Sequence, residues 1–277
     1  MKIIITLSGN SERFTSKGYP IKSLIDIDGK KVIEYVLEMF PDIKDEDFIF
    51  AVRSDDLSSS PIESEILKLK NSKIYPVPKN SLGPVYSIST FMDNLPDDEE
   101  IIVSYCDLTQ LWDFHDFLNF CRDTDSDGCL VTHVGFLPHK LYNKSFAFLS
   151  TGKNSKVSYV HEKKPMELVR PDEPASNGIY YFKSGKLLKT YFKKLMDGKH
   201  AVNGEYYVTV PYNLMIEDKL NVTYYNANQY VCLGTPVDVE CFKCWKYIIE
   251  HNNLDKQSVS YIYDFWNDYF NRIKNIT

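Results

Sequence analysis

The first 26 residues limit the fold of this chain more than any other stretch. Lys2–Leu7 is an apolar, β-branched run of strand length, and small loop-forming residues fill positions 8–11. A buried strand that runs into such a loop is how α/β proteins bring backbone N–H groups close to a phosphate. Arg13 and Lys22 follow on the same stretch, and their charges would neutralise a polyphosphate. The stretch is consistent with an α/β protein that has a phosphate site at its first loop, and by itself also with an ordinary strand and surface loop.

Composition and known motifs exclude several classes of protein. Neither G-x-G-x-x-G nor G-x-x-x-x-G-K-[ST] occurs in the 277 residues, so the usual dinucleotide-binding and P-loop folds are not indicated. A formal net charge of −6 argues against a non-specific nucleic-acid binder, which would be basic. No apolar run approaches the ~20 residues of a membrane span, and the six cysteines are irregularly spaced. We expect a cytoplasmic protein with free thiols and neither nucleic acid nor membrane as partner.

Strand-like and helical runs alternate through the first half of the chain. After the first loop, the patterns predict strands at residues 23–27, 48–52, 73–77, 101–105 and 129–133. They predict helices at residues 31–40, 62–69, 85–94 and 112–121. Such alternation indicates a mainly parallel sheet flanked by helices, and ligands bind such sheets beyond the carboxyl ends of the strands.

The second half has the sequence pattern of an α+β fold. Short strand-like runs at residues 147–149, 157–161, 179–182 and 221–226 lie among helical runs such as 204–217. The chain beyond residue 240 supplies terminal helices, for example 263–273. No linker-like stretch separates the halves, so we expect one domain over residues 1–277.

The first loop resembles the opening of the sugar-phosphate nucleotidylyltransferases, also called nucleoside-diphosphate-sugar pyrophosphorylases. Their signature is Gly-x-Gly-x-Arg-[Phe/Leu] followed by a Pro-Lys-Pro-Leu-like segment. Here these read Gly9-Asn10-Ser11-Glu12-Arg13-Phe14 and Ile21-Lys22-Ser23-Leu24. Ser11 replaces the second glycine, and both prolines around Lys22 are missing.

Further blocks similar to those of the family follow in the family's order. They lie at residues 82–87, 105–107, 162–165, 175–182, 204–207 and 234–238. Residues 105–107 and 135–139 resemble the corresponding motifs of the subgroup that serves the synthesis of bacterial capsule and surface polysaccharides. The resemblance implies a Rossmann-like nucleotidyltransferase fold, with an NTP-binding half at 1–125 and an acceptor-binding half with terminal helices at 126–277.

The activity that the resemblance implies joins an NTP to a sugar phosphate or polyol phosphate and releases pyrophosphate. CTP is slightly favoured over UTP or dTTP, Mg²⁺ is the implied cofactor, and the implied pathway is capsule or surface-polysaccharide synthesis. The sequence does not fix the oligomeric state, and a homodimer is one option.

The matching positions carry the family's roles onto this chain. The implied catalytic residues are Arg13, Lys22 and Asp107. The implied NTP-binding residues are Leu7, Ser8, Gly9, Asn10, Ser11, Ser81, Gly83 and Asp107. The implied acceptor-binding residues are Glu162, Lys163, Asn177, Gly178, Glu205 and Tyr206.

The metal site departs from the family's pattern. The implied ligands are Asp107 and Asp238, because Cys232 stands where many relatives carry an aspartate, and a thiol is a poor Mg²⁺ ligand. A site with Asp107 as its single carboxylate is equally compatible with the sequence.

Two other classes of function stay open on the sequence alone. A nucleotide-sugar glycosyltransferase of related fold would normally carry Asp-x-Asp, whereas Tyr105-Cys106-Asp107 lacks the first aspartate. A non-catalytic nucleotide-binding relative would be consistent with Ser11 and Cys232. No role is assigned to His133, His139 or His161.

Overall fold

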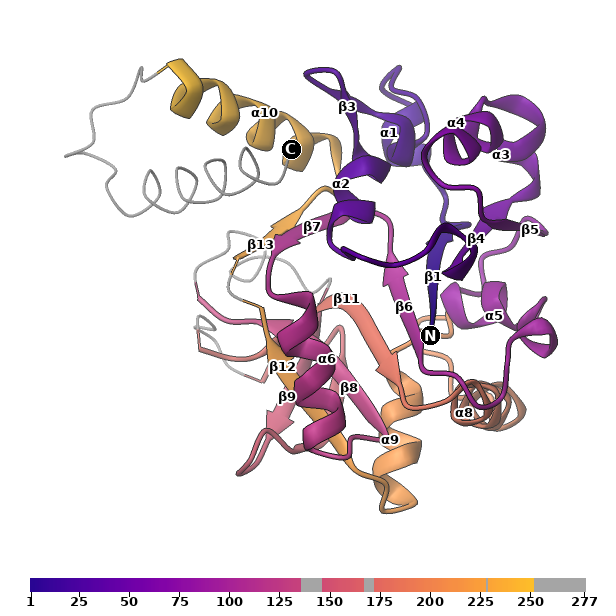
Figure 1. The fold of residues 1–277 in the computed structure, drawn as a ribbon, viewed down its shortest axis with the longest axis vertical. Coiled ribbons are helices and arrows are strands. Elements are labelled where there is room, and N and C mark those ends of the chain that lie inside the picture. Colours follow the sequence, from indigo (N-terminus) through magenta and orange to yellow (C-terminus); the bar gives the residue numbers. More distant parts are fainter. Residues whose placement is uncertain (136–145, 167–171, 228, 252–277) are drawn as a thin grey trace. The chain divides into compact units, whose positions relative to one another are not determined.

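The computed structural model describes residues 1–135, 146–166, 172–227 and 229–251 (Figure 1). The chain forms two compact units. The large unit consists of residues 1–9, 42–106 and 114–226. The small unit consists of residues 10–41, 107–113 and the described residues from Ala227 onward. No helix in the described ranges has the length and apolar character needed to cross a bilayer.

A single mixed sheet forms the centre of the large unit. Its main path runs β10-β9-β11-β6-β1-β4-β5, and β8 pairs with β11 while β12 pairs with β8. The pairs of β1 with β4 and β6, of β4 with β5, and of β12 with β8 are parallel. β11 runs antiparallel to β6, β8 and β9. The expected α/β fold with a mainly parallel, helix-flanked sheet is confirmed.

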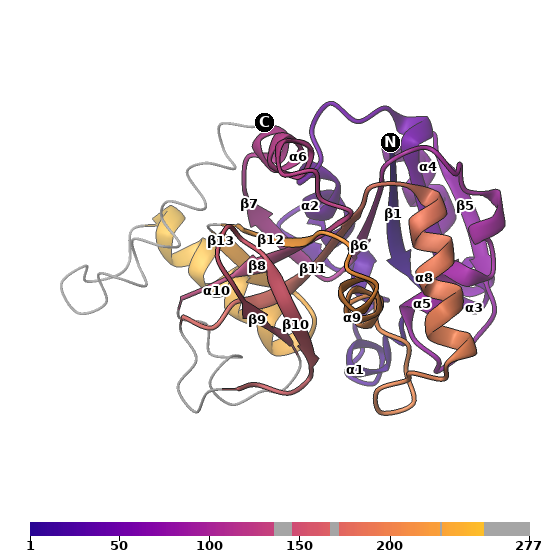
Figure 2. The ribbon, with the colours of Figure 1, turned by 90° about the horizontal axis from the view of Figure 1, so that it is seen from below.

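The strands of this sheet have the following bounds: β1 Lys2–Leu7, β4 Phe48–Arg53, β5 Lys73–Val77, β6 Ile101–Tyr105, β8 Gly128–His133, β9 Ala147–Thr151, β10 Val157–Glu162, β11 Ala175–Phe182 and β12 Val222–Asn226. The helices among the described residues of the large unit are η2 Asp45–Asp47, α3 Ser54–Ser59, α4 Ile62–Leu69, α5 Pro84–Ser89, η3 Met92–Asn94, α6 Phe114–Asp123, α8 Gly185–Asp197 and α9 Val210–Glu217. α8 packs against α5 and α9, and α9 packs against β10 (Figure 2).

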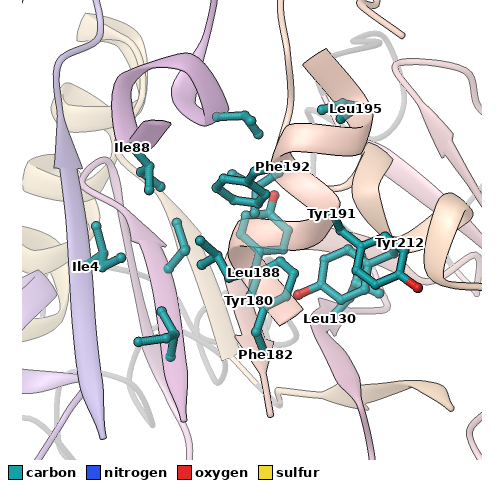
Figure 3. Packing of buried hydrophobic residues seen from close by; sticks show 14 of the residues in the cluster. Ile4, Ile88, Leu130, Tyr180, Phe182, Leu188, Tyr191, Phe192, Leu195 and Tyr212 are labelled. Atoms are coloured by element: carbon teal, nitrogen blue, oxygen red, sulfur yellow. The ribbon is translucent and has the colours of Figure 1, made fainter. Parts of the chain in front are cut away.

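The core of the large unit lies between the sheet and these helices. Ile4 on β1 is fully buried, as expected for a strand with neighbours on both sides. Phe182 on β11 packs against Tyr212 of α9 and Phe192 of α8, with ring centroids 5.0 and 5.7 Å apart (Figure 3). The Tyr212 hydroxyl donates to the Tyr181 carbonyl at 2.9 Å, which satisfies the one polar atom of a fully buried ring.

Strand β10 is the edge strand at one end of this sheet, and a side chain of α9 covers part of its free edge. The Val160 N–H donates to Asn213 Oδ1 at 2.8 Å, and Asn213 Nδ2 donates to the Val160 carbonyl at 2.9 Å. An amide thus imitates the missing neighbouring strand and satisfies both backbone groups of one edge residue. This pairing fixes the position of β10, whose last residue is Glu162.

The small unit is built from two short ribbons and helices. β2 Asp26–Ile27 pairs with β3 Lys30–Lys31, and β7 Leu108–Leu111 pairs with β13 Gln229–Cys232, both antiparallel. Its helices are α1 Glu12–Thr15, η1 Lys22–Leu24, α2 Val32–Glu38 and α10 Pro236–His251. Phe14, Tyr35 and Phe242 belong to its separate hydrophobic core.

Several expected elements differ from the structure. Residues 22–24 form a 3₁₀ turn, which leaves only Asp26–Ile27 of the strand expected at 23–27. The helix expected at 85–94 divides into α5 and η3. The helix expected at 204–217 begins at Val210, because Asn203 and Gly204 have φ of +52° and +83° and form a turn. The helix expected at 112–121 begins at Phe114, and the one expected at 263–273 lies outside the described residues.

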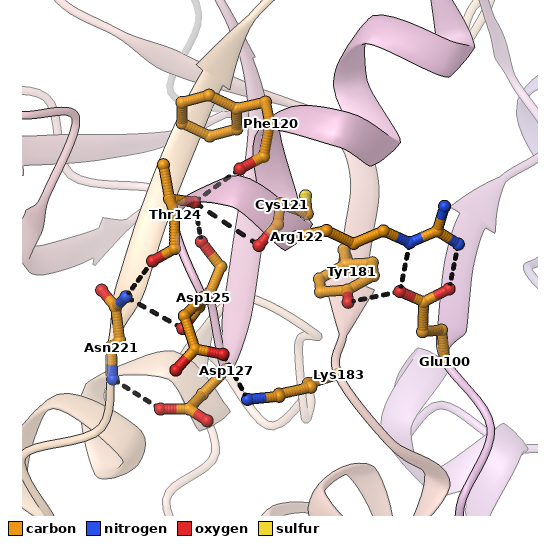
Figure 4. A network of polar contacts seen from close by, with 11 residues as sticks. Glu100, Phe120, Cys121, Arg122, Thr124, Asp125, Asp127, Tyr181, Lys183 and Asn221 are labelled. Atoms are coloured by element: carbon orange, nitrogen blue, oxygen red, sulfur yellow. Dashed lines mark hydrogen bonds and ion pairs between the residues drawn. The ribbon is translucent and has the colours of Figure 1, made fainter.

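A polar network closes the sheet end where β6 begins and α6 ends (Figure 4). Arg122 donates to both carboxylate oxygens of Glu100, at 2.9 and 2.6 Å, and the Tyr181 hydroxyl donates to Glu100 at 2.9 Å. Burial alone would raise the pKa of Glu100, but these donors reverse the effect and hold the pKa below its ordinary value. The Asn221 side chain extends the network, since it donates to the Thr124 carbonyl at 2.7 Å.

We predict that Glu100→Gln lowers the free energy of unfolding by about 1–2 kcal/mol at pH 7, because the variant loses a charge-assisted interaction. The stabilisation exists above the unfolded-state pKa and is lost as the pH falls through the depressed native pKa. Urea unfolding at pH 7 and pH 3 should therefore show a smaller difference in unfolding free energy between wild type and variant at pH 3. Glu63→Gln, on the exposed face of α4, is the control and should change neither curve. An equal gap at both pH values would contradict the prediction.

Candidate functional site

The first loop begins in the large unit, at the carboxyl end of β1. Leu7 and Ser8 are buried and Gly9 is exposed. The Ser8 hydroxyl donates to Ser87 Oγ at 2.8 Å, and Ser87 Oγ donates to the Gly83 carbonyl at 3.2 Å. Side chains on α5 thus link the loop after β1 to the loop before α5.

The loop before α5 carries the predicted NTP-binding residues Ser81 and Gly83. Ser81 is exposed, and Gly83 has a φ of +89°, in the region that favours glycine. A Cβ added at Gly83 would lie 2.9 Å from both the nitrogen and the oxygen of Tyr206. The Tyr206 N–H donates to the Leu82 carbonyl at 2.8 Å, and the Val85 N–H donates to the Tyr206 carbonyl at 3.1 Å. The predicted nucleotide loop and a predicted acceptor residue are therefore in direct backbone contact.

Glu205 lies at the end of a tight turn rather than on a helix. Its N–H donates to the Val202 carbonyl at 3.0 Å, and the Val202 N–H donates to the Glu205 carbonyl at 2.9 Å. Asn203 and Gly204, the two residues between them, both have positive φ, as in a two-residue hairpin turn. This turn fixes the backbone that leads into Tyr206.

The end of β10 carries Glu162 and Lys163. The Thr209 hydroxyl donates to Glu162 Oε2, and Lys163 Nζ donates to the Tyr207 hydroxyl. Lys163 Nζ also lies 4.3 Å from the Tyr207 ring centroid, within reach of a cation–π contact. Lys163 has a φ of +55°, so it lies in a turn after the strand. The alternating orientation of strand residues therefore does not apply to Lys163 and Lys164.

Burial raises the pKa of the Glu162 carboxyl group to about 7. The hydrogen bond from Thr209 and the charge of Lys163 oppose this rise, whereas the charge of Glu205 adds to it. The structure thus brings together Glu162, Lys163 and Glu205, three residues predicted to bind the acceptor. A carboxyl group that changes charge near neutral pH stands beside a cation.

The sequence did not identify Tyr207 and Thr209 as functional. Tyr207 closes the block at residues 204–207 that resembles the family, and only that membership could have indicated it. Thr209 occupies the N-cap position of α9, where a threonine is ordinary. Its contact with Glu162 joins residues far apart in the chain, which no local pattern reveals.

Asn177 and Gly178 lie on β11, where its pairing with β8 is irregular between Ser176 and Tyr180. Asn177 is buried, and Gly178 has a φ of +96°. Such a β-bulge redirects side chains locally. At this end of the sheet Ala175 of β11 pairs with Phe148 of β9, and the neighbouring Ala147 pairs with Glu162. The two predicted acceptor blocks therefore share one end of the sheet.

In the small unit, the two segments of the opening signature meet. The Lys22 N–H donates to the Ser11 hydroxyl at 3.3 Å, and Ser11 is buried. Asn10 lies before α1, and its side chain accepts from the Glu12 N–H at 3.1 Å. Arg13 is exposed on α1. Ser11, which replaces the family's second glycine, thus ties the loop to the segment that carries Lys22.

Asp107 and Lys22 form an ion pair in the small unit. Lys22 Nζ lies 2.9 Å from Asp107 Oδ2, and the side chains are 18% and 27% exposed. The Leu233 N–H donates to the Asp107 carbonyl at 2.8 Å. A Cβ at Gly234 would lie 3.4 Å from Asp107 Oδ2 and equally close to Cys232 Sγ. The block at 234–238 therefore adjoins the carboxylate that the sequence predicts as a metal ligand.

Asp238 stabilises the start of α10. Its Oδ2 accepts from the Thr235 hydroxyl at 2.7 Å and from the Thr235 N–H at 2.8 Å. Asp238 is buried, and Cys232 Sγ lies 3.6 Å from the same oxygen. A carboxylate in this position is typical of a helix N-terminus.

The donor set fits Mg²⁺ through one carboxylate. Mg²⁺ prefers oxygen ligands and is usually held by one or two carboxylates together with substrate phosphates. Asp107 is partly exposed, whereas one oxygen of Asp238 already accepts two hydrogen bonds. Within the described ranges, no group of three His, Cys, Asp or Glu side chains is arranged to hold a metal ion.

The sequence assigns no role to His133, His139 or His161. His161 Nε2 lies 2.9 Å from Ser150 Oγ, and His133 is buried on β8. His139 lies outside the described residues.

Comparisons with known proteins bear on both units. The model of the MobA-like NTP transferase domain family matches residues 3–149. Curated protein sequences give no match. The nucleoside-diphosphate-sugar pyrophosphorylase from Vibrio cholerae RC9 is 21% identical with a TM-score of 0.72, over 87% of this chain and 99% of that one.

Two further solved structures share the fold. A putative glucose-1-phosphate thymidylyltransferase from Bacillus anthracis is 17% identical with a TM-score of 0.65, over 87% of this chain and 93% of that one. The inositol-1-phosphate CTP transferase from T. maritima is 13% identical with a TM-score of 0.62, over 86% and 91%.

We predict that Glu162→Gln changes how stability depends on pH. The native pKa of about 7 lies above the ordinary value of 4.5, so the native state holds a proton that the unfolded state releases. As the pH rises from 4.5 through 7, the free energy of unfolding of wild type should fall by up to about 3 kcal/mol relative to that of the variant. Urea unfolding at pH 5 and pH 8 measures this difference. Glu217→Gln, exposed on α9, is the control, and parallel pH profiles for wild type and Glu162→Gln would contradict the prediction.

Proposed function

The chain belongs to the MobA-like NTP transferase domain family and is a nucleotidyltransferase, and we propose that its second substrate is a sugar phosphate or polyol phosphate. The products are an NDP-sugar-type compound and pyrophosphate. CTP is the favoured nucleotide, and the product serves capsule or surface-polysaccharide synthesis. The cytoplasmic location stays a prediction from the sequence, and no oligomeric state is proposed.

The ion pair of Lys22 with Asp107 is the observation that carries this proposal. In the reaction, a phosphate oxygen of the acceptor attacks the α-phosphorus of the NTP and pyrophosphate leaves. Both reactants are anions, so the enzyme must position them and neutralise their charge. A lysine 2.9 Å from a partly exposed aspartate supplies a cation for phosphate oxygens and a carboxylate for a metal ion.

The remaining roles on the nucleotide side follow from position and charge. Arg13 would hold the β- and γ-phosphates, because its guanidinium group is exposed beside the loop. Asp107 would hold Mg²⁺, which when bound adds charge neutralisation to the triphosphate. Asp238 is the weaker candidate ligand, since Thr235 already donates two hydrogen bonds to one of its oxygens.

The acceptor side rests on Lys163 and the carboxylates near it. A dianionic phosphate suits Lys163, and Glu162 and Glu205 can accept hydrogen bonds from hydroxyl groups of a sugar or polyol. Asn177 and Gly178 lie at the same end of the sheet. The printed names of the similar structures, which include glucose 1-phosphate and inositol 1-phosphate, support this class of acceptor.

The proposed base preference and biological role rest on resemblance to other proteins. One similar structure is named as a CTP transferase, and we propose CTP on that likeness and on the sequence resemblance. The capsule role is proposed from the sequence resemblance of residues 105–107 and 135–139, of which residues 136–139 lie outside the described ranges. The glycosyltransferase and non-catalytic alternatives are not retained, given the family membership.

A matrix of nucleotides and phosphate esters tests the proposal. CTP, UTP, dTTP, ATP and GTP are each combined with hexose 1-phosphates, heptose phosphates and polyol phosphates in the presence of Mg²⁺. We expect pyrophosphate release to require both partners and to be greatest with CTP. Release of a nucleoside diphosphate from a nucleotide sugar, without pyrophosphate formation in the matrix, would contradict the proposal.

We predict that activity needs Mg²⁺ and that Asp107→Asn lowers kcat by roughly 10²-fold or more, the scale of removing one preorganised electrostatic contact. The substitution keeps the size of the side chain and removes its charge. Asp28→Asn is the matched control, because Asp28 forms an ion pair with Lys246 at 2.7 Å in the same unit. Pyrophosphate release under saturating substrates measures kcat. An Asp107→Asn enzyme within a few-fold of wild type would remove Asp107 from the metal site.

We predict that Arg13→Ala raises the KM for the NTP by about tenfold or more, because it removes a charge-assisted contact with the triphosphate. The KM for the acceptor should change far less. Lys17→Ala, another exposed cation just after α1, is the control. Steady-state kinetics with each substrate varied in turn separates the two constants. A rise confined to the acceptor KM would assign the loop to the other substrate.

We predict that Lys163→Ala weakens acceptor use, with a loss in kcat/KM of about 2–3 kcal/mol for a charge-assisted phosphate contact. NTP binding without acceptor, measured by calorimetry, should barely change. Lys164→Ala is the control, because Lys164 is the exposed neighbour. A large loss of NTP affinity in Lys163→Ala would mean that Lys163 contacts the triphosphate. A loss of acceptor use only in Lys164→Ala would move the role to that residue.

A further inference from the structure

The segment of residues 205–209 contacts both groups of predicted ligand residues in the large unit. On the nucleotide side the contact is through the backbone. Tyr206 accepts from Val85 and donates to Leu82, at 3.1 and 2.8 Å. Because a Cβ at Gly83 would lie 2.9 Å from two Tyr206 backbone atoms, only glycine allows the loop before α5 to approach this segment so closely.

On the acceptor side the contacts are through side chains. Tyr207 holds the ammonium group of Lys163 by a hydrogen bond and by the face of its ring. Thr209 donates to the Glu162 carboxyl group. Each of the two candidate acceptor residues at the end of β10 is thus held by a different side chain of the same segment.

The Thr209 hydroxyl contacts Glu162 and not the start of α9. Thr209 is the N-cap residue of α9, yet its side chain makes no capping hydrogen bond with the helix. The Thr209 backbone is helical, and the second residue of α9 is Pro211, which has no N–H to donate to a capping side chain. Here the hydroxyl is directed to Glu162, which indicates that Thr209 serves the position of the carboxyl group.

The segment is anchored at both ends, so it can transmit a displacement. The turn of residues 202–205 closes with two reciprocal backbone hydrogen bonds. Val208 is fully buried, and its backbone forms a hydrogen bond with the Tyr105 side chain. Residues 205–209 are thus fixed on one side by the turn and on the other by Tyr105 of β6.

We propose that residues 205–209 couple the two substrate sites, with Tyr207 and Thr209 as positioning residues. A nucleotide bound at the loop before α5 fixes Tyr206, and the same segment then holds Glu162 and Lys163 in position for the phosphorylated acceptor. The inference rests on the proposed function, because it assigns the loop before α5 to the nucleotide and the end of β10 to the acceptor.

Coupling of this kind is reciprocal. If bound nucleotide raises the affinity for the acceptor by some factor, bound acceptor raises the affinity for the nucleotide by the same factor. We expect a factor of about 5 to 50, within the common range of coupling between sites. Loss of the Tyr207 and Thr209 hydroxyl groups should reduce the factor toward one without removing nucleotide binding.

Hydrogen exchange of the full chain tests the coupling without any turnover. CTP, UTP, dTTP, ATP and GTP are added singly with Mg²⁺ and without acceptor, and exchange is followed in peptides that cover residues 81–89 and 157–164. In wild type we expect one nucleotide to slow exchange in both peptides. In Tyr207→Phe/Thr209→Val, protection of 81–89 should persist, whereas protection of 157–164 should be lost.

Two control variants separate positioning from a general structural effect. Thr209→Ser keeps the hydroxyl and should retain protection in both peptides. Tyr191→Phe removes a tyrosine hydroxyl that donates to Asp218 at 2.9 Å, remote in sequence from the segment, and should behave as wild type. In kinetics, Thr209→Val should raise the acceptor KM about tenfold or more and leave the NTP KM within about threefold, whereas Thr209→Ser should not.

The possible outcomes separate a failure of the coupling from a failure of the proposed function. Protection of 81–89 without protection of 157–164 in wild type overturns the coupling and leaves the proposed function standing. Retention of both protections in the double variant also overturns the coupling. If no nucleotide protects residues 81–89, the nucleotide assignment of that loop fails, and the inference fails with it.

Discussion

Gly83 and Tyr206 meet through their backbones, and the arrangement of the predicted ligand residues in the large unit depends on that contact. Two hydrogen bonds hold Tyr206 between Leu82 and Val85, and a side chain at position 83 would collide with it. The positive φ of Gly83 adds a second reason for glycine at this position. Because the contact is made by main-chain atoms, it does not depend on the rotamers of long side chains. Residues 207 and 209 follow directly, and their side chains reach Lys163 and Glu162. One close approach of two loops thereby places two groups of predicted ligand residues.

In the small unit, the Lys22–Asp107 pair contributes more to geometry than to stability. Lys22 and Asp107 are partly exposed, and pairs of this kind stabilise a fold by little. Their value lies in fixing a cation and a carboxylate 2.9 Å apart before any substrate arrives. Glu162 differs, because burial raises its pKa to about 7 and makes its charged form costly. A carboxyl group stands there although an amide would be easier to bury, and carboxyl groups with strongly raised pKa values cluster at functional sites.

Local patterns predicted the elements that are bounded by clear breaks. β1, β5, β6 and α4 have the predicted bounds, because each is an apolar or periodic run that ends at polar or loop-forming residues. β7 and β13 were missed, since four-residue strands of a separate ribbon carry too few residues for a period. The predicted site residues fall into both units, and the sequence could name them only through the resemblance to a family. Tyr207 and Thr209 act through partners distant in the chain, so neither periodicity nor spacing could have shown them.

The two departures from the family's pattern have different physical consequences. Ser11 adds a contact, because its hydroxyl accepts from the Lys22 N–H, which a glycine at this position could not provide. Cys232 removes a carboxylate, and its sulfur is a soft ligand that Mg²⁺ disfavours. Asp238 does not simply replace it, since Thr235 donates two hydrogen bonds to its Oδ2 at the start of α10. In the proposed reaction Asp107 therefore carries the protein's share of the metal contact, and phosphate oxygens and water must supply the remaining ligands. Metal binding then depends on the nucleotide, and the Lys22–Asp107 pair keeps the carboxylate charge compensated until the nucleotide arrives.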